Sequence, residues 1–325
     1  MNDSKIEMYI LKILRKLYGS VTNTPVEPTL HKFEFFDPQT TNSLIYDKLM
    51  NIEPCMIARF GSTELQCLTN YLGTMNNSRN WLGYIKGKAL PWWWNPKKAY
   101  NLHYYSGFFP NELNKVVQFC ELMQDCMPKT DILGSWLYEE QYHADLLKNA
   151  VRVDLELLNP YFSDKPWTKA LENKKVLVIH PFSETIESQY KKRTLIFANN
   201  LLPEFELITI KAVQSIANGE TEYIDWFQAL DYMKTEINKI DFDICLIGAG
   251  AYGFPLAAYV KKIGKKGFHL GGSLQLLFGI KGKRWEDPNY NEKYKYNQLM
   301  NEYWVKPNEK DKPRDSQNIE NACYW

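Results

Sequence analysis

Residues Ile244 to Gly272, ICLIGAGAYGFPLAAYVKKIGKKGFHLGG, combine two short apolar runs with a glycine-rich turn and an amphipathic segment. The runs at 243–247 and 267–270 have the length and composition of buried strands, and 254–264 has the periodicity of a helix. A strand, a helix and a second strand in this order predict a βαβ unit with parallel strands.

Strands and helices alternate in the same way along the rest of the chain. Further strands are predicted at 55–60, 131–135, 175–180 and 206–210, and further helices at 42–50, 63–72, 110–123, 139–149, 186–200, 222–239 and 291–303. The sequence therefore predicts an α/β fold, with a Rossmann-like, mostly parallel sheet and helices on both faces. Ligands of such sheets bind beyond the carboxyl ends of the strands, where the site residues are sought.

The N-terminal segment is predicted to be an amphipathic helix over residues 4–18, followed by a polar linker over 19–32. A short basic helix of this kind either packs on the domain or a partner subunit, as in a homo-oligomer, or lies on an anionic membrane surface. We expect residues 33–325 to form a single α/β domain. Its C-terminal extension is expected to pack back on the body, because Cys323, Tyr324 and Trp325 form an apolar end after a polar stretch.

Composition narrows the class of protein. The 325 residues are 45% hydrophobic and 24% charged, which is typical of a globular protein and excludes a mainly disordered chain. The 39 Lys and Arg residues nearly balance 38 Asp and Glu residues, so no nucleic-acid partner is expected. The six cysteines lack zinc-site spacing and are expected to be reduced, as in a cytosolic protein. The sequence contains no run of about 18 apolar residues, so no membrane-spanning helix is predicted.

Glycines dominate the turn after Ile247. Gly248, Gly250 and Gly253 form a GxGxxG pattern between a predicted strand and a predicted helix, the context in which backbone N–H groups approach a phosphate. Tyr252 lies in the same turn. A dinucleotide site also needs an acidic residue after the next strand, where this chain has His269. We therefore interpret the turn as a phosphate- or nucleotide-approach loop rather than a nicotinamide site.

The first predicted strand ends in the sequence Arg59-Phe60-Gly61-Ser62-Thr63-Glu64. Gly61 permits a turn, Ser62 or Thr63 can cap the next helix, and a carboxylate at Glu64 is favoured in the first helical turn. These features are sufficient for a helix start alone. Arg59 and Glu64 also place a cation and a potential base at a strand end.

Two other strand ends carry polar groups. After His180, Ser183 and Glu184 precede a predicted helix, whose start either binds a phosphate or is simply capped. After the strand at 267–270, two glycines precede a basic cluster that either clamps a diphosphate beside a stacking Trp or forms a solvated loop. The residues of this second group are Gly271, Gly272, Lys283, Arg284 and Trp285.

Two aromatic clusters add to the candidates, Trp92-Trp93-Trp94 and His103-Tyr104-Tyr105. Three successive Trp side chains cannot all point inward on a regular element, so at least one is expected to line a groove or an interface. Aromatic platforms suit carbohydrate ligands, although packing under a long loop explains them equally well.

Together these motifs resemble the GT-D type glycosyltransferases, bacterial enzymes of surface glycan and glycoprotein assembly. The resemblance rests on Ser62-Thr63-Glu64 and on the block from Gly248 to Gly272, and it spans most of residues 50–285. It implies a nucleotide-sugar donor, UDP-linked, and a glycan or glycoprotein acceptor. The cysteine pattern predicts a cytoplasmic location, at the inner face of the membrane where residues 4–18 lie on it.

The chain departs from that family at Ser62, where the family has the Asp of an Asp-x-Glu motif associated with a divalent metal and the sugar diphosphate. Only Glu64 remains as a metal ligand, so the need for Mn²⁺ or Mg²⁺ is left open. Lys283 or Arg284 is the alternative to a metal ion for neutralising the negative charge of the leaving diphosphate.

The leading hypothesis is a hexosyltransferase-type enzyme of polysaccharide or glycoprotein biosynthesis. Glu64 is the predicted base or the contact to sugar or metal, and Arg59 joins Lys283 and Arg284 as a phosphate ligand. The predicted substrate-binding residues are Gly61, Ser62, Thr63, His180, Ser183, Glu184, Gly248, Gly250, Tyr252, Gly253, His269, Gly271, Gly272, Lys283, Arg284 and Trp285. Two alternatives stay open: a non-catalytic glycan- or nucleotide-binding assembly protein, and an NAD-dependent Rossmann-type oxidoreductase.

Overall fold

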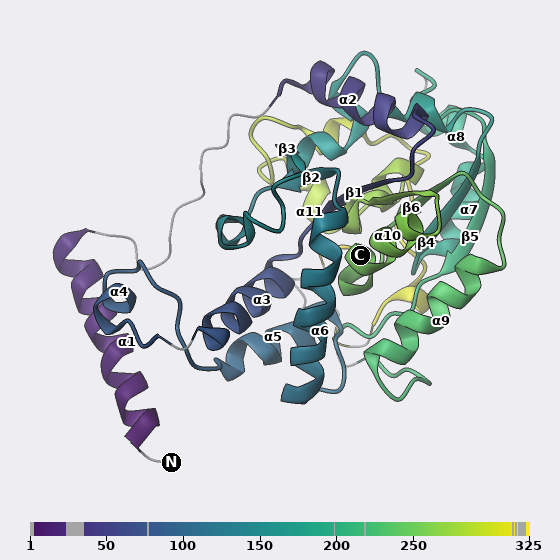
Figure 1. Ribbon diagram of the computed structural model, residues 1–325. Coiled ribbons are helices and arrows are strands. Elements are labelled where there is room, and N and C mark those ends of the chain that lie inside the picture. The colour runs from purple at the N-terminus through teal and green to yellow at the C-terminus, as the bar shows by residue number, and fades with distance from the viewer. Residues whose placement is uncertain are drawn as a thin grey trace.

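The computed structural model describes residues 3–23, 36–76, 78–197, 199–217, 219–313, 315, 317 and 323–325 (Figure 1). The rest of the predicted linker after residue 23 lies outside the described residues. Residues 19–22, by contrast, belong to the N-terminal helix.

The centre of the molecule is a seven-stranded sheet in which every neighbouring pair is parallel. The strands run in the order β3-β2-β1-β7-β6-β4-β5. Their bounds are β1 Cys55–Arg59, β2 Ile132–Ser135, β3 Val151–Asp154, β4 Lys175–His180, β5 Glu206–Lys211, β6 Ile244–Ile247 and β7 Lys266–His269. The predicted α/β fold with a parallel sheet is confirmed.

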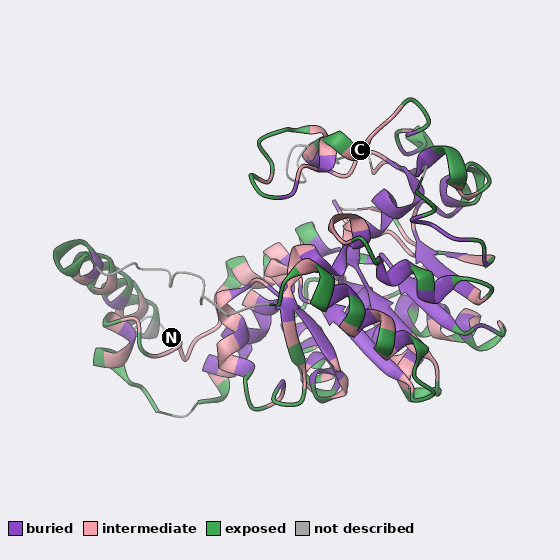
Figure 2. Cartoon of the chain, turned by 90° about the horizontal axis from the view of Figure 1, so that it is seen from above, coloured by how far each residue is buried: buried purple, intermediate pink, exposed green. Residues whose placement is uncertain are grey.

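Helices cover both faces of this sheet (Figures 1 and 2). Alternate strand residues point to opposite faces, so Met56 and Ala58 pack in one core while Cys55 and Ile57 pack in the other. The first core includes residues of α3 Ser62–Met75, α5 Pro96–Ser106, α6 Leu113–Cys126, α9 Trp226–Asn238 and α10 Gly253–Lys262. The second includes residues of α2 Pro38–Met50, α7 Ser183–Tyr190, α8 Arg193–Ile196, α11 Lys283–Glu286 and the 3-10 helix η7 Gly271–Phe278.

The remaining 3-10 segments are short connections. They are η1 Met127–Lys129, η2 Tyr138–His143, η3 Leu155–Leu158, η4 Pro160–Phe162, η5 Trp167–Leu171, η6 Gly250–Tyr252, η8 Tyr296–Leu299 and η9 Glu309–Asp311. All six cysteines lie in the described part of the chain, where each is buried and none forms a disulfide.

Several predicted elements were wrong. The helix predicted at 291–303 is a series of turns with one short 3-10 segment, because the Asn291 side chain accepts from the N–H groups of Lys293 and Tyr294 in a local turn. The helix predicted at 139–149 is η2 followed by turns, and the one at 186–200 is two shorter helices, α7 and α8. Strand β3, helix α5 and the short helices Trp81–Ile85 and Lys283–Glu286 were not predicted.

The N-terminal helix α1 Asp3–Thr22 lies beside α4 Trp81–Ile85, away from the sheet in both views (Figures 1 and 2). Leu11 is buried in this contact, and the guanidinium of Arg15 lies 4.8 Å from the ring centroid of Tyr84. None of the helices in the described part of the chain combines the length and the apolar character needed to cross a bilayer.

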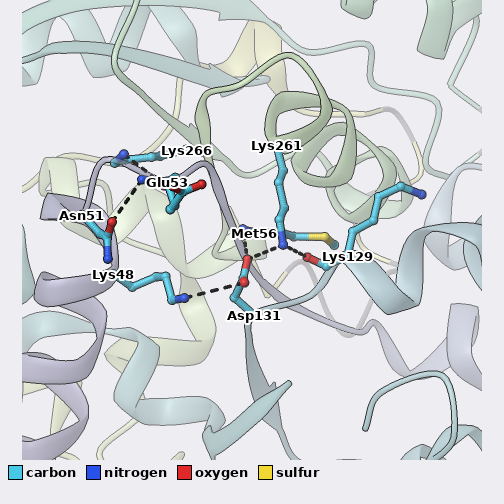
Figure 3. A network of polar contacts seen from close by, with 8 residues as sticks. All are labelled: Lys48, Asn51, Glu53, Met56, Lys129, Asp131, Lys261 and Lys266. Atoms are coloured by element: carbon cyan, nitrogen blue, oxygen red, sulfur yellow. Dashed lines mark hydrogen bonds and ion pairs between the residues drawn. The ribbon is translucent and has the colours of Figure 1, made fainter. Parts of the chain in front are cut away.

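A polar network centred on Asp131 joins the amino ends of β1 and β2 (Figure 3). Its carboxylate accepts from the Met56 N–H at 2.8 Å and pairs with Lys261 at 2.7 Å and Lys48 at 3.6 Å. This network lies at the amino ends of the strands. The polar site candidates lie at the opposite edge of the sheet, beyond the carboxyl ends.

Candidate functional site

A cavity of about 960 Å³ opens beyond the carboxyl ends of β1, β7, β6 and β4, which are neighbours in the sheet. Each of these strands contributes a candidate: Arg59 ends β1, His269 ends β7, Gly248 follows β6, and His180 ends β4. Because the strands are parallel, residues 59, 180, 248 and 269, far apart in the sequence, meet at one edge.

The first corner of the cavity holds Arg59 and Glu64. The Arg59 guanidinium lies over the ring of Trp136, with its carbon 5.1 Å from the ring centroid, and the Trp136 Nε1–H donates to the Phe60 carbonyl at 3.0 Å. Burial lowers the pKa of Arg59, but a guanidinium remains charged at neutral pH. The aromatic face and the fixed indole hold this cation at the end of β1.

Glu64 lies in the first turn of α3 and is 8% exposed. Thr63 Oγ1–H donates to Glu64 Oε2 at 3.0 Å, and the Thr63 hydroxyl also contacts the hydroxyl of Ser106. The carboxylate folds over Gly61, where a Cβ atom would overlap it. The helix start therefore holds a carboxylate against the cavity wall.

Both strand-end histidines are neutral. Burial lowers the pKa of His180 to about 3, and burial together with Arg59 lowers the pKa of His269 to about 3. The Phe182 N–H donates to Nδ1 of His180 at 3.0 Å, so the proton of His180 is on Nε2. His269 Nδ1 contacts the Ile247 carbonyl at 3.3 Å, which requires its proton on Nδ1.

These rings account for two of the three glycines in the GxGxxG pattern. A Cβ at residue 248 would overlap the His180 ring, and a Cβ at residue 253 would overlap the His269 ring. Gly250 differs: its φ is +52°, and the nearest atom to an added Cβ is the Ser106 carbonyl oxygen at 3.8 Å. Only at Gly250 does the loop leave open space, and that space belongs to the cavity.

Arg284 and the C-terminal residues form another part of the cavity wall. The Arg284 guanidinium carbon lies 5.1 Å from the ring centroid of Tyr324, and its NH2 group donates to Cys323 Sγ at 3.1 Å. The Gln275 amide holds the Tyr324 carbonyl at 3.1 Å, and Trp325 also lines the cavity. This wall joins residues from the end of the chain to the sheet edge.

An aromatic side of the cavity comes from α5. Tyr100 and Tyr104 are stacked with ring centroids 5.8 Å apart and planes 8° apart, and both line the cavity with Tyr105. Trp92, Trp93 and Trp94 do not line it; Trp93 packs edge to face on Tyr84, and Trp94 lies against the first core.

Most sequence-predicted site residues line the cavity in the structure: Arg59, Gly61, Ser62, Thr63, Glu64, His180, Gly248, Gly250, Tyr252, His269, Gly271, Gly272 and Arg284. Five do not. Gly253 and Ser183 are buried beside it, and Trp285, 3% exposed, packs in the second core. Lys283 is exposed, and Glu184 pairs with Lys310 at the surface.

Sequence reasoning missed Tyr100, Trp136, Ser215, Gln275 and Tyr324 as cavity residues. A signal existed for the helix that carries Tyr100, because Asn95-Pro96 is a cap followed by proline at the first helical position. No comparable signal marks Trp136 or Tyr324, which reach the cavity through tertiary packing.

The donor set around the cavity is a poor fit for a divalent metal. Among the described residues that line it, Glu64 carries the only side-chain carboxylate, whereas Mg²⁺ and Ca²⁺ prefer several oxygen ligands. No group of three or more His, Cys, Asp or Glu side chains in the described ranges is arranged to hold a metal ion. The positive charge of the site comes from Arg59 and Arg284.

Comparison with known proteins gives one match. A family model described as GT-D-like, a GT-D fold-like domain, matches residues 37–277. This range is well over half of the chain and contains every strand of the sheet. No curated protein and no solved structure matches the chain.

Proposed function

Because the chain belongs to the GT-D-like family, we propose that it is a glycosyltransferase that moves a sugar from a nucleotide-diphosphate donor, UDP-linked, to a glycan or glycoprotein. The observation that carries the proposal is the position of Arg59 and Arg284, two cations lining one cavity at the carboxyl ends of the central strands. A nucleotide sugar loses a diphosphate, whose charge must be stabilised as it develops.

The diphosphate lies between these arginines and the backbone at Gly250. Arginine binds phosphate oxygens through paired N–H groups, and both side chains are held on aromatic rings. The open space at Gly250 admits a phosphate near backbone N–H groups. The arginines supply the charge that a divalent metal supplies in other transferases.

Glu64 is the proposed base. An acceptor hydroxyl forms a bond to the anomeric carbon, the bond from that carbon to the diphosphate oxygen breaks, and the hydroxyl proton passes to the Glu64 carboxylate. Thr63 orients the carboxylate by donating to Oε2. The Nε2–H of His180 is a donor in the same cavity, suited to a sugar hydroxyl.

The acceptor is assigned to the aromatic side of the cavity. The stacked rings of Tyr100 and Tyr104 present flat apolar faces with hydroxyl groups at their edges, which suits the faces of sugar rings. We place the reaction in bacterial surface polysaccharide or glycoprotein biosynthesis, on the cytoplasmic side of the membrane.

A panel of UDP-, GDP- and dTDP-sugars is incubated with the protein and analysed for nucleotide diphosphate released as water takes the place of the acceptor hydroxyl, which tests the proposal. Release from one donor, reduced at least about 10²-fold by Glu64→Gln, supports it. The low carboxylate content of the cavity favours one rival, a binding protein without turnover; tight donor binding with no release would favour that rival. Thermal stabilisation by NADH but not by UDP would favour an oxidoreductase, although no acidic side chain follows β7.

A further inference from the structure

Helix α1 carries apolar side chains that stay exposed in the described structure. Figure 2 shows the helix apart from the sheet, with much of its length coloured as exposed. Seven apolar side chains on it are between 41% and 84% exposed: Ile6, Tyr9, Ile10, Ile13, Leu14, Leu17 and Val21. The opposite side of the helix is occupied, because Leu11 and Arg15 pack toward α4. The exposed face is therefore not the one that holds α1 to the protein.

The exposed residues form one continuous sector. At about 100° per residue, the seven side chains fall within a sector of about 140°. The apolar seam of a two-stranded coiled coil is narrower, because it uses only two positions in each heptad. The sector is wider than such a seam and is broad enough for a helix that lies in a membrane interface.

The positive charges along one border of this face also favour a membrane surface. Lys5, Lys12 and Lys16 are exposed and fall within about 40° of one another at 100° per residue, directly beside the apolar sector. Glu7 lies on the other border of the sector, about 20° beyond Leu14, where it pairs with Arg79 at 3.8 Å. A lysine row beside an apolar face matches a surface with anionic headgroups above acyl chains.

The neighbouring α4 adds two exposed apolar side chains, Trp81 at 51% and Leu82 at 69%. Lys86 and Lys88, which follow α4, are exposed as well. Because α4 packs on the side of α1 that carries Arg15, opposite the apolar sector, these side chains do not belong to the apolar face of α1.

We propose that α1 docks the protein on an anionic lipid bilayer, with α1 lying in the plane of the interface and its apolar face toward the acyl chains. A second copy of the chain is the competing occupant. In an antiparallel pair the lysine rows of the two copies would face each other, which is unfavourable. The inference does not rest on the proposed reaction, because lipid binding is measured without substrate.

Flotation of the full chain with vesicles tests the proposal. One set of vesicles contains phosphatidylcholine and phosphatidylglycerol in equal parts, and the other contains phosphatidylcholine alone. The wild-type chain is expected to bind the anionic vesicles more strongly and to lose binding as salt is raised. Because each lysine near an anionic surface contributes roughly a fivefold factor, Lys12→Glu with Lys16→Glu should reduce the partition coefficient by at least about tenfold.

The apolar face is tested by Ile10→Glu with Ile13→Glu, which is expected to abolish binding to both vesicle types. Ile52→Glu is the matched control, since Ile52 is 91% exposed and lies near the sheet. It is expected to bind as the wild type does, and all variants are expected to keep the wild-type melting temperature because the altered side chains are exposed.

Two results would overturn the proposal. One is a wild-type chain that does not float, or that binds both vesicle types equally with no effect of the lysine changes. The other is a wild-type dimer in light scattering that Ile10→Glu with Ile13→Glu converts to a monomer while vesicle binding is absent. The second result would assign the face to contact between copies.

Discussion

The imidazole of His269 lies against the Cα atom of Gly253, so that a Cβ atom at residue 253 would overlap the ring. The last glycine of the GxGxxG pattern thus makes room for a histidine at the end of the neighbouring strand. The ring is 3% exposed and lines the cavity, while Gly253 does not. This glycine supports the site indirectly, through the position of His269.

Gly253→Ala is therefore expected to destabilise the fold. Overpacking of a well-packed site costs about 1–3 kcal/mol in the free energy of unfolding, which urea denaturation measures. In a His269→Ala background the same substitution should cost much less, because the ring is gone. Equal costs in both backgrounds would show that the contact does not constrain residue 253.

Gly250→Ala is expected to weaken nucleotide-sugar binding more than it lowers stability. The φ of +52° imposes a backbone cost of about 1–2 kcal/mol on any other residue, and the new methyl group enters the cavity. Gly264→Ala is the matched control, since φ is +82° there and no atom lies within 4 Å of an added Cβ. Calorimetry and melting temperature on both variants separate strain from lost space; equal donor affinities would remove Gly250 from the donor site.

Glu64→Gln is expected to reduce sugar transfer by about 10²–10⁴-fold, because the amide keeps the shape of the side chain but cannot take a proton. Glu184→Gln provides the comparison. Glu184 also occupies the first turn of a helix after a central strand, but it pairs with Lys310 outside the cavity. Turnover and melting temperature are measured for both. Near-normal turnover of Glu64→Gln would leave Glu64 a helix-start residue only.

Stability is expected to fall as the pH is lowered below about 6.5. Burial lowers the pKa of His143 to about 4, that of His180 to about 3, and, with Arg59, that of His269 to about 3. The unfolded chain, with histidine pKa values near 6.5, binds these protons first, so each group costs up to about 1.4 kcal/mol per pH unit between its two pKa values. This loss in the free energy of unfolding is absent above about pH 6.5 and increases as the pH falls toward 4.

Urea denaturation between pH 7 and pH 4.5 measures this slope. His180→Asn keeps an acceptor for the Phe182 N–H but cannot titrate, and it is expected to have a shallower slope than the wild-type chain. A wild-type slope that the substitution leaves unchanged would mean that His180 is not held neutral by the fold.

The fold was largely predictable from the sequence because buried parallel strands are apolar runs separated by amphipathic helices. All six predicted strands are present, with β4 at its predicted bounds. Strand β3 was missed because its four residues, Val151–Asp154, lie at the edge of the sheet and alternate apolar with charged side chains. The segment 291–303 was misassigned because Tyr294 and Tyr296 are buried, as on the apolar face of a helix, although the segment forms no α-helix.

The candidate site was predictable only where it follows strand ends. Arg59, His180, Gly248 and His269 meet because the sheet is parallel, and strand prediction places them at one edge. Local sequence could not distinguish Arg284 from Lys283, one lining the cavity and the other exposed, because a four-residue helix turns them in different directions. Nor could it show that Gly248 and Gly253 make room for the rings of His180 and His269.

The most direct test of the donor site compares Arg284→Gln with Lys283→Gln by calorimetric titration with the UDP-sugar that the donor panel identifies. Arg284→Gln is expected to weaken binding at least about tenfold, because a hydrogen bond to a charged group contributes about 1.5–3 kcal/mol. Arg284→Lys should restore part of that loss, and Lys283→Gln should bind as the wild-type chain does. Unchanged affinity in a folded Arg284→Gln, or an equal loss in both glutamine variants, would contradict a diphosphate held by the cavity's arginines.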